Sequence, residues 1–182
     1  MKNEYLILVN AQFPMHVSEP TDLVSVSPAY PKIKLRRAAQ TALAELLHTI
    51  GSDDKIVPVS GYRSRMEQTQ IYESSLLENG ADFTKKFVAL PGHSEHQTGL
   101  AIDLALNQDV IDFIRPDFPY DGICGEFRKL APKYGFIERY PMGKETITGI
   151  AHEPWHFRYA GYPHSEIMNA NSLTLEEYIG TL

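Results

Sequence analysis

Two short polar clusters contain the residues of this chain best suited to chemistry. The first spans residues 94–103 and contains His96 and Asp103. The second, Glu153-Pro154-Trp155-His156, places a carboxylate three residues before an imidazole. A catalytic zinc needs three such protein ligands, an open position for water, and a nearby base that removes a proton from that water. The two clusters therefore predict a hydrolytic zinc site.

Each residue of these clusters also has a simpler structural explanation. His96 could be a loop histidine, Asp103 a turn or capping residue, and Glu153 a surface carboxylate. On a regular strand, an offset of three places Glu153 and His156 on opposite faces, so they converge only if the chain bends at Pro154. The spacing does not decide which carboxylate would bind a metal and which would act as the base.

Size and charge restrict the kind of protein. The 182 residues suit one domain with a substantial core, and the formal net charge of −6 argues against a general nucleic-acid binder. Cys124 is the single cysteine, so no intrachain disulfide forms, which fits a reducing compartment. We find no stretch long enough for a membrane span and no signal peptide. We expect a cytoplasmic protein, with export or membrane anchoring as the alternative if a leader precedes this sequence.

Hydrophobic periodicity predicts the elements that position these residues. Helices are expected over residues 34–49, 65–79 and 126–133, with a short terminal helix capped by Thr174. Strands are expected over residues 56–59, 100–106, 135–139 and 156–159. Residues 1–33 are expected to form an extended arm packed on a domain of residues 34–182. This mixed order predicts an α+β fold with a central antiparallel sheet flanked by helices.

The pattern Ser-x-His-x-x-Gly-x-Ala-x-Asp, followed by Glu-Pro-Trp-His, resembles that of the VanY and VanX zinc D,D-peptidases. Further matching segments lie between residues 60 and 165, including Ser60-Gly61-Tyr62-Arg63 and Tyr134-Gly135-Phe136-Ile137. The length most resembles the bifunctional VanXY D,D-dipeptidase/D,D-carboxypeptidases. The resemblance implies the LAS-type metallopeptidase fold, which is hedgehog/D,D-peptidase-like, and makes residues 34–182 the zinc peptidase domain.

The resemblance also implies roles for individual residues. His96, Asp103 and His156 would hold Zn²⁺, and Glu153 would be the catalytic base. Arg63 would stabilise the developing oxyanion or hold a substrate carboxylate, and its simpler explanation is a surface salt bridge.

Three more residues are expected in the substrate site by the same resemblance: Ser94, Gln68 and Tyr140. Each has a plain alternative, as a turn, helix-surface and edge-aromatic residue respectively. We assign no role to the remaining histidines near the motifs, His93, His152 and His164.

The function implied by the resemblance is a D,D-carboxypeptidase or D,D-dipeptidase, or both, acting on D-Ala-D-Ala-type ends of peptidoglycan precursors and contributing to vancomycin resistance. The expected partner is a small peptide, D-Ala-D-Ala or a pentapeptide precursor, and the expected state is a monomer or weak homodimer. The alternatives are an exported L,D-carboxypeptidase or endopeptidase of the same fold, and a non-catalytic zinc module that binds peptidoglycan. Such a module has no use for a base such as Glu153. Pocket depth, set by loops at residues 77–87 and 107–124, is expected to decide between dipeptidase and carboxypeptidase activity.

Overall fold

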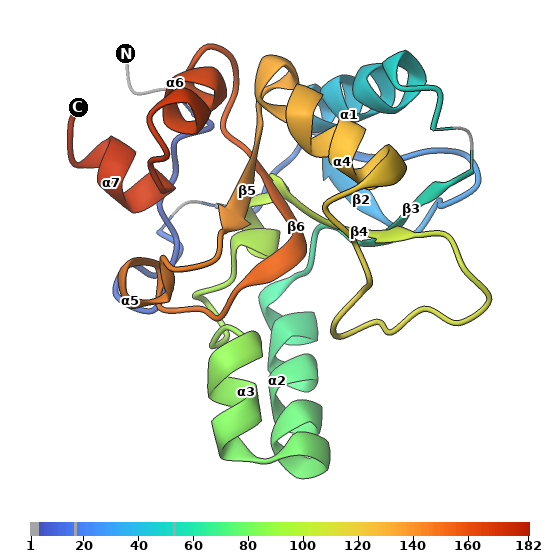
Figure 1. Ribbon diagram of the computed structural model, residues 1–182. Helices are drawn as coiled ribbons and strands as arrows, with labels where there is room; N and C mark the ends of the chain where they lie inside the picture. The colour runs from blue at the N-terminus through green and yellow to red at the C-terminus, as the bar shows by residue number, and fades with distance from the viewer. Residues whose placement is uncertain (1–3, 17, 53) are drawn as a thin grey trace.

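A four-stranded antiparallel sheet forms the centre of the molecule in the computed structural model, which describes residues 4–16, 18–52 and 54–182 (Figure 1). The strand order is β3-β4-β6-β5. These strands are β3 (Ile56–Ser60), β4 (Ala101–Leu106), β6 (Glu153–Tyr159) and β5 (Phe136–Tyr140). A separate two-stranded sheet pairs β1 (Leu23–Ser25) with β2 (Lys34–Arg36). The two middle strands, β4 and β6, carry the two polar clusters of the sequence.

Helices surround this sheet on several sides (Figure 1). Two of them lie together at one end, α1 (Arg37–Thr49) and α4 (Gly122–Leu130). A helical hairpin projects away from the sheet and consists of α2 (Arg65–Asn79) and α3 (Ala81–Phe87). The remaining helices are short: α5 (Glu145–Thr148), α6 (His164–Ala170) and α7 (Leu175–Ile179). Two 3₁₀ helices span Glu95–Thr98 and Ala131–Tyr134.

The main hydrophobic core lies between the sheet and the α1–α4 pair. Strand β4 is almost fully buried, and its Ile102 and Leu104 pack in one cluster with Leu46 of α1 and Phe127 of α4. Such continuous burial requires apolar side chains on the strand, which explains why Asp103 stands out within it. A smaller cluster joins β5 to α6 and α7.

The predicted α+β fold with a central antiparallel sheet flanked by helices is confirmed. Helix 65–79 has the expected bounds. The helix predicted over residues 34–49 is wrong at its start, because Lys34–Arg36 pair with β1 as a strand and α1 begins at Arg37. That pairing involves a partner distant in the sequence, which helical periodicity does not reveal.

The helix predicted over residues 126–133 is wrong in both bounds. It runs over Gly122–Leu130, although glycine disfavours helix interiors. A side chain at position 125 would approach the Tyr120 carbonyl oxygen to 2.7 Å, so the close approach of the preceding loop requires Gly125. Pro132 lies in the 3₁₀ helix that follows, since proline lacks the N–H that continues an α-helix.

The segment 77–87, expected as a loop, is mostly helical. Gly80 adopts a φ of 81° between α2 and α3, and the Ser75 and Thr84 hydroxyls hydrogen-bond at 2.8 Å between the two helices. Of the expected arm, residues 1–3 and 17 lie outside the described part of the chain, and residues 23–25 form β1. The division of the chain at residue 33 stays a prediction.

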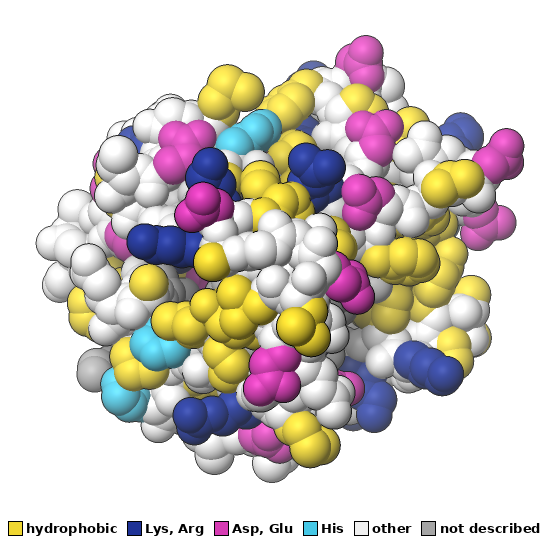
Figure 2. Space-filling view, turned by 90° about the horizontal axis from the view of Figure 1, so that it is seen from below, with side chains coloured by type: hydrophobic (Ala, Val, Ile, Leu, Met, Phe, Trp, Pro, Cys, Tyr) yellow, Lys and Arg dark blue, Asp and Glu magenta, His cyan; other side chains and the backbone are white. Residues whose placement is uncertain are grey.

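The hairpin side of the molecule presents a mixed surface. Figure 2 shows this face from below, with hydrophobic side chains interspersed among acidic and basic ones. Leu77 and Met66 of α2 are among the exposed hydrophobic residues. No helix within the described ranges is both long and apolar enough to span a bilayer.

Candidate active site

Three potential metal ligands converge where β4 meets β6. Asp103 of β4 and His156 of β6 are directly paired across the two strands. His96 comes from the 3₁₀ helix that precedes β4, and Gly99, with a φ of 68°, turns the chain between them. One ligand atom from each of the three buried side chains lies within 4.8 Å of the other two.

The orientation of these side chains fits a zinc ion. The Asp103 carboxylate bridges the two imidazoles, with Oδ2 3.2 Å from His96 Nε2 and Oδ1 2.9 Å from His156 Nδ1. His96 Nδ1 donates a hydrogen bond to the Gly61 carbonyl oxygen at 2.6 Å, which leaves Nε2 with a lone pair facing the site. Two imidazole nitrogens and one carboxylate oxygen are a donor set of catalytic zinc.

Glu153 joins this group because β6 contains a bulge. Phe157 pairs with Glu138 of β5, whereas Glu153 pairs with Tyr140, so β6 contains more residues than β5 between these pairs. The expectation that offset three separates Glu153 from His156 holds only for a regular strand. In the bulged strand the Glu153 Oε2 lies 3.8 Å from His156 Nδ1. The predicted strand 156–159 therefore begins earlier than expected, at Glu153.

The three potential ligands and Glu153 all have strongly perturbed pKa values. Burial, and then the Arg63 guanidinium, lower the pKa of His96 to about 4, so this imidazole is neutral at pH 7. Burial alone would lower the pKa of His156, but the neighbouring carboxylates of Asp103 and Glu95 outweigh it and raise this pKa to about 9.

The pKa values of the two carboxyl groups Asp103 and Glu153 are also shifted in opposite directions. Burial disfavours the ionised Asp103, but the two imidazoles outweigh it and hold the pKa of Asp103 well below its usual range. Burial raises the pKa of Glu153 to about 8 against the opposing attraction of His156. Of Asp103 and Glu153, only Glu153 therefore has a pKa near neutral pH. This range suits a general base, which must gain and then lose a proton.

Arg63 faces the cavity. Its Nη2 lies 3.6 Å from the Asp103 carboxylate, and its Nη1 donates a hydrogen bond to Gln68 Oε1 at 3.0 Å. Gln68 in turn donates from Nε2 to the Ala89 carbonyl oxygen at 2.8 Å. Gln68 is buried rather than a helix-surface residue, and its amide fixes the direction of the guanidinium.

Ser94 and Tyr140 line the same cavity of about 450 Å³ as Arg63 and Gln68. Both residues are buried. The Tyr140 ring lies against the His156 ring with centroids 4.9 Å apart. Burial raises the pKa of Tyr140 well above its usual range, so its hydroxyl stays protonated and can donate a hydrogen bond.

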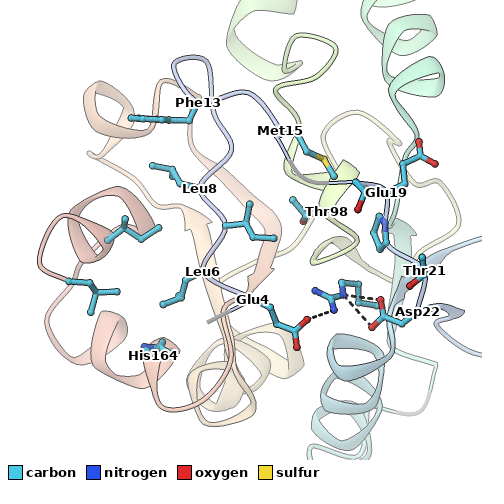
Figure 3. A pocket seen from close by; sticks show the side chains of 16 residues that line it. Glu4, Leu6, Leu8, Phe13, Met15, Glu19, Thr21, Asp22, Thr98 and His164 are labelled. Carbon is cyan, nitrogen blue, oxygen red and sulfur yellow. Dashed lines mark hydrogen bonds and ion pairs between the residues drawn. The ribbon is translucent and has the colours of Figure 1, made fainter. Parts of the chain in front are cut away.

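The three histidines near the motifs that have no assigned role, His93, His152 and His164, make hydrogen bonds away from this group. Their partners are the Asn10 carbonyl oxygen for His93, the Tyr120 hydroxyl for His152 and the Tyr178 hydroxyl for His164. His164 of α6 also lines a second, mostly apolar cavity of about 1210 Å³, whose walls include Leu6 and Leu8 of the N-terminal segment and Ile179 of α7 (Figure 3). None of the predicted site residues lines that cavity.

One carboxylate of the site was missed by the sequence analysis. Glu95 precedes the predicted ligand His96, and its side chain is completely buried. Its Oε2 lies 3.5 Å from His156 Nε2, on the side of the ring opposite Asp103. The one signal in the sequence was that a charged residue directly precedes a predicted ligand, and this alone does not identify the partner of the charge.

Comparison with known proteins agrees with this geometry. The model of the family VanY, described as D-alanyl-D-alanine carboxypeptidase, matches residues 32–162. The chain is 44% identical over 175 residues to the bifunctional D-Ala-D-Ala dipeptidase and D-Ala-D-Ala carboxypeptidase VanXYC of Enterococcus gallinarum, covering 95% of this chain and 92% of that protein.

Two solved structures extend the comparison. The vancomycin resistance D,D-dipeptidase VanXYg, in complex with a D-Ala-D-Ala phosphinate analogue, has 58% identity and a TM-score of 0.96, over 97% of this chain and 70% of that chain. A mutant of the vancomycin resistance D,D-pentapeptidase VanY from a VanB-type cassette, in complex with Zn(II), has 29% identity and a TM-score of 0.78. The match covers 97% of this chain and 99% of that chain. With a family match over most of its length and a fold shared with these enzymes, the chain belongs to the VanY family of D-alanyl-D-alanine carboxypeptidases.

Proposed function

We propose that this protein is a zinc-dependent D,D-peptidase that hydrolyses D-Ala-D-Ala ends of peptidoglycan precursors, as a D,D-carboxypeptidase, a D,D-dipeptidase or both, and thereby contributes to vancomycin resistance. The observation that carries the proposal is the convergence of His96, Asp103, His156 and Glu153 in one buried cavity. The relatives supply the substrate class, since they act on D-Ala-D-Ala or bind its analogue.

In this proposal His96, Asp103 and His156 hold the zinc ion. Zinc, when bound, polarises the scissile carbonyl and makes water a nucleophile at neutral pH. Glu153 takes the proton from the attacking water and returns it to the leaving amine. Its buried position and raised pKa suit both transfers, because the same group must accept and then release a proton.

The polar residues around the cavity orient the substrate. Arg63 presents charged donors to the carbonyl oxygen as it becomes an oxyanion, or to the terminal carboxylate. Ser94 and Tyr140 offer hydroxyl groups on the walls of the same cavity. Gln68 contributes by holding Arg63, because its oxygen and nitrogen are engaged by Arg63 and the Ala89 backbone.

We further propose that the protein acts in the cytoplasm as a monomer or weak homodimer, on precursors that have not yet been exported. The single buried thiol of Cys124 supports a reducing compartment. Fractionation of cells and light scattering of the purified protein test these two statements.

Zinc removal should destabilise the protein if the three ligands are assigned correctly. Free zinc at about a thousand times its Kd stabilises a protein by about 4 kcal/mol, which raises the Tm of a chain of this size by roughly 10 °C. Differential scanning calorimetry with zinc and with a chelator measures this shift. We expect Asp103→Asn to abolish the shift and His152→Ala, a histidine outside the group, to retain it. A wild-type Tm that does not respond to zinc contradicts the assignment.

Substrate assays test the proposed function directly. We expect hydrolysis of D-Ala-D-Ala or of a pentapeptide that ends in it, no hydrolysis of L-Ala-L-Ala, and weaker hydrolysis of D-Ala-D-lactate ends. A site that pairs polar groups of one configuration discriminates strongly against analogues that leave those groups unpaired. Release of D-alanine is the measurement. Equal rates on D,D and L,L dipeptides contradict the proposal, faster cleavage of an L,D bond supports an L,D-carboxypeptidase, and binding without turnover supports a non-catalytic module.

Glu153→Gln should retain zinc and lose turnover. The amide keeps the shape of the side chain but accepts no proton, and general-base catalysis is worth about 10²–10⁴-fold in rate. Steady-state kinetics together with metal analysis measure the two effects. Glu126→Gln, on the exposed surface of α4, is the matched control and should leave kcat unchanged. Near-normal kcat in Glu153→Gln would mean that another group is the base.

Arg63→Lys separates the two roles proposed for the arginine. If Arg63 stabilises the oxyanion, kcat falls sharply, because an ammonium group does not reproduce the planar fork of donors. If it holds only the terminal carboxylate, KM rises and kcat is retained. Arg65→Lys, at an exposed position two residues later, is the control. Unchanged kcat and KM in the Arg63 variant would remove Arg63 from the substrate site.

A further inference from the structure

Two buried polar atoms beside the candidate metal site face each other. Within the described chain, Glu95 Oε2 and His156 Nε2 have no hydrogen-bond partner, although both atoms are buried. They lie 3.5 Å apart. A buried donor or acceptor without a partner costs about 1–3 kcal/mol, so this pair requires an explanation.

The position of His156 Nδ1, the other ring nitrogen, explains why Glu95 lies beside Nε2. His156 Nδ1 lies 2.9 Å from Asp103 Oδ1, on the side where the metal ligands converge. A neutral imidazole has a proton on one nitrogen and a lone pair on the other, and the partner of the first nitrogen decides which is which. In the structure Nδ1 hydrogen-bonds the Asp103 carboxylate, and a metal ion that binds Nδ1 would replace that proton. The remaining ring proton is then on Nε2, where it faces the Glu95 carboxylate.

We propose that Glu95 is a positioning residue that holds His156 as the Nε2–H tautomer, with Nδ1 directed at the zinc ion. This inference rests on the ligand set given under the proposed function. His96 would then have the opposite tautomer, since its Nδ1 donates to the Gly61 carbonyl oxygen and its Nε2 faces the site. The two imidazoles would be oriented by different acceptors, one a backbone carbonyl and the other a buried carboxylate.

Two buried arginines keep Glu95 charged and fixed. Its Oε1 accepts hydrogen bonds from Arg139 Nε at 2.8 Å and Arg158 Nη1 at 2.9 Å. This pairing holds the pKa of Glu95 well below its usual range although burial opposes it. Because Oε1 is occupied by both guanidinium groups, Oε2 is the oxygen that remains for His156.

The N-terminal segment and the last helix complete this arrangement. Arg139 also binds Glu176 of α7 through two hydrogen bonds of 2.9 and 2.6 Å. Arg158 Nη2 donates to the backbone carbonyls of Tyr5 and Ile7. These contacts balance two buried positive charges, which would otherwise be costly to bury. Segments far from the cavity therefore support the orientation of one metal ligand.

The substitution Glu95→Gln tests the role of the carboxylate. The two guanidinium groups would hold the amide oxygen and direct its NH₂ group at His156 Nε2. That nitrogen must then accept, so the ring proton moves to Nδ1 and blocks the lone pair. We expect zinc binding about 10–100-fold weaker than in the wild type, measured by competition with a chromophoric chelator.

Glu176→Gln is the matched control. It also removes a carboxylate from Arg139 and should lower Tm, but it does not contact His156, so zinc affinity should stay at the wild-type value. Equal loss of zinc affinity in both variants, or wild-type affinity in folded Glu95→Gln, would overturn the proposal.

A measurement on the wild-type protein tests the same proposal even if the Glu95→Gln variant does not fold. Long-range ¹H–¹⁵N NMR of the zinc-loaded protein reports which nitrogen of each histidine carries the proton. We expect the proton on Nε2 of His156 and on Nδ1 of His96. A proton on Nδ1 of a zinc-bound His156 would overturn the inference alone, whereas failure of the wild type to bind zinc at His156 would overturn the ligand set itself.

Discussion

The antiparallel pairing of β4 with β6 is the constraint on which the site depends. It places Asp103 directly opposite His156, with Ile102 opposite Phe157 as the next pair along the strands. Successive side chains of a strand point to opposite faces, so the apolar neighbours of Asp103 enter the core while Asp103 faces the cavity. A shift of one residue would bury the carboxylate in the core and expose the apolar set. The register that packs the core is therefore also the register that brings the metal ligands together.

The departure from regular pairing is as important as the pairing. The bulge in β6 brings Glu153 to the same side as His156, which a regular strand would not do. Arg128 of α4 stabilises this segment by donating to the Pro154 carbonyl oxygen at 2.6 Å, and the same nitrogen donates to the Phe118 carbonyl oxygen, in the loop before α4, at 2.7 Å. Its other Nη group pairs with Glu138 of β5. A side chain from helix α4, outside the sheet, thus helps to hold the irregular backbone that positions the proposed base.

The sequence predicted the parts of the structure that depend on local pattern. Helix α2 and the central strands follow from periodicity, and the motif around His96 and Asp103 identified the cavity that the structure shows. The missed features depend on partners distant in the sequence. The pairing of β2 shortened the first helix, and the arginines that bind Glu95 lie 44 and 63 residues after it. Nothing in the spacing of Glu95, Arg139 and Arg158 indicates that they meet.

The two buried glutamates beside His156 show how one cavity gives similar groups different properties. Glu95 is paired with two guanidinium groups, so its pKa lies well below its usual range and it stays ionised. Glu153 has no comparable arginine pair among the described residues, and burial raises its pKa to about 8. Two carboxyl groups with opposite shifts suit separate tasks, one holding an orientation and the other exchanging protons. Arg139 and Arg158 bind Glu95 and not Glu153. Glu153 therefore keeps a pKa near neutral pH, which allows it to act as both an acid and a base.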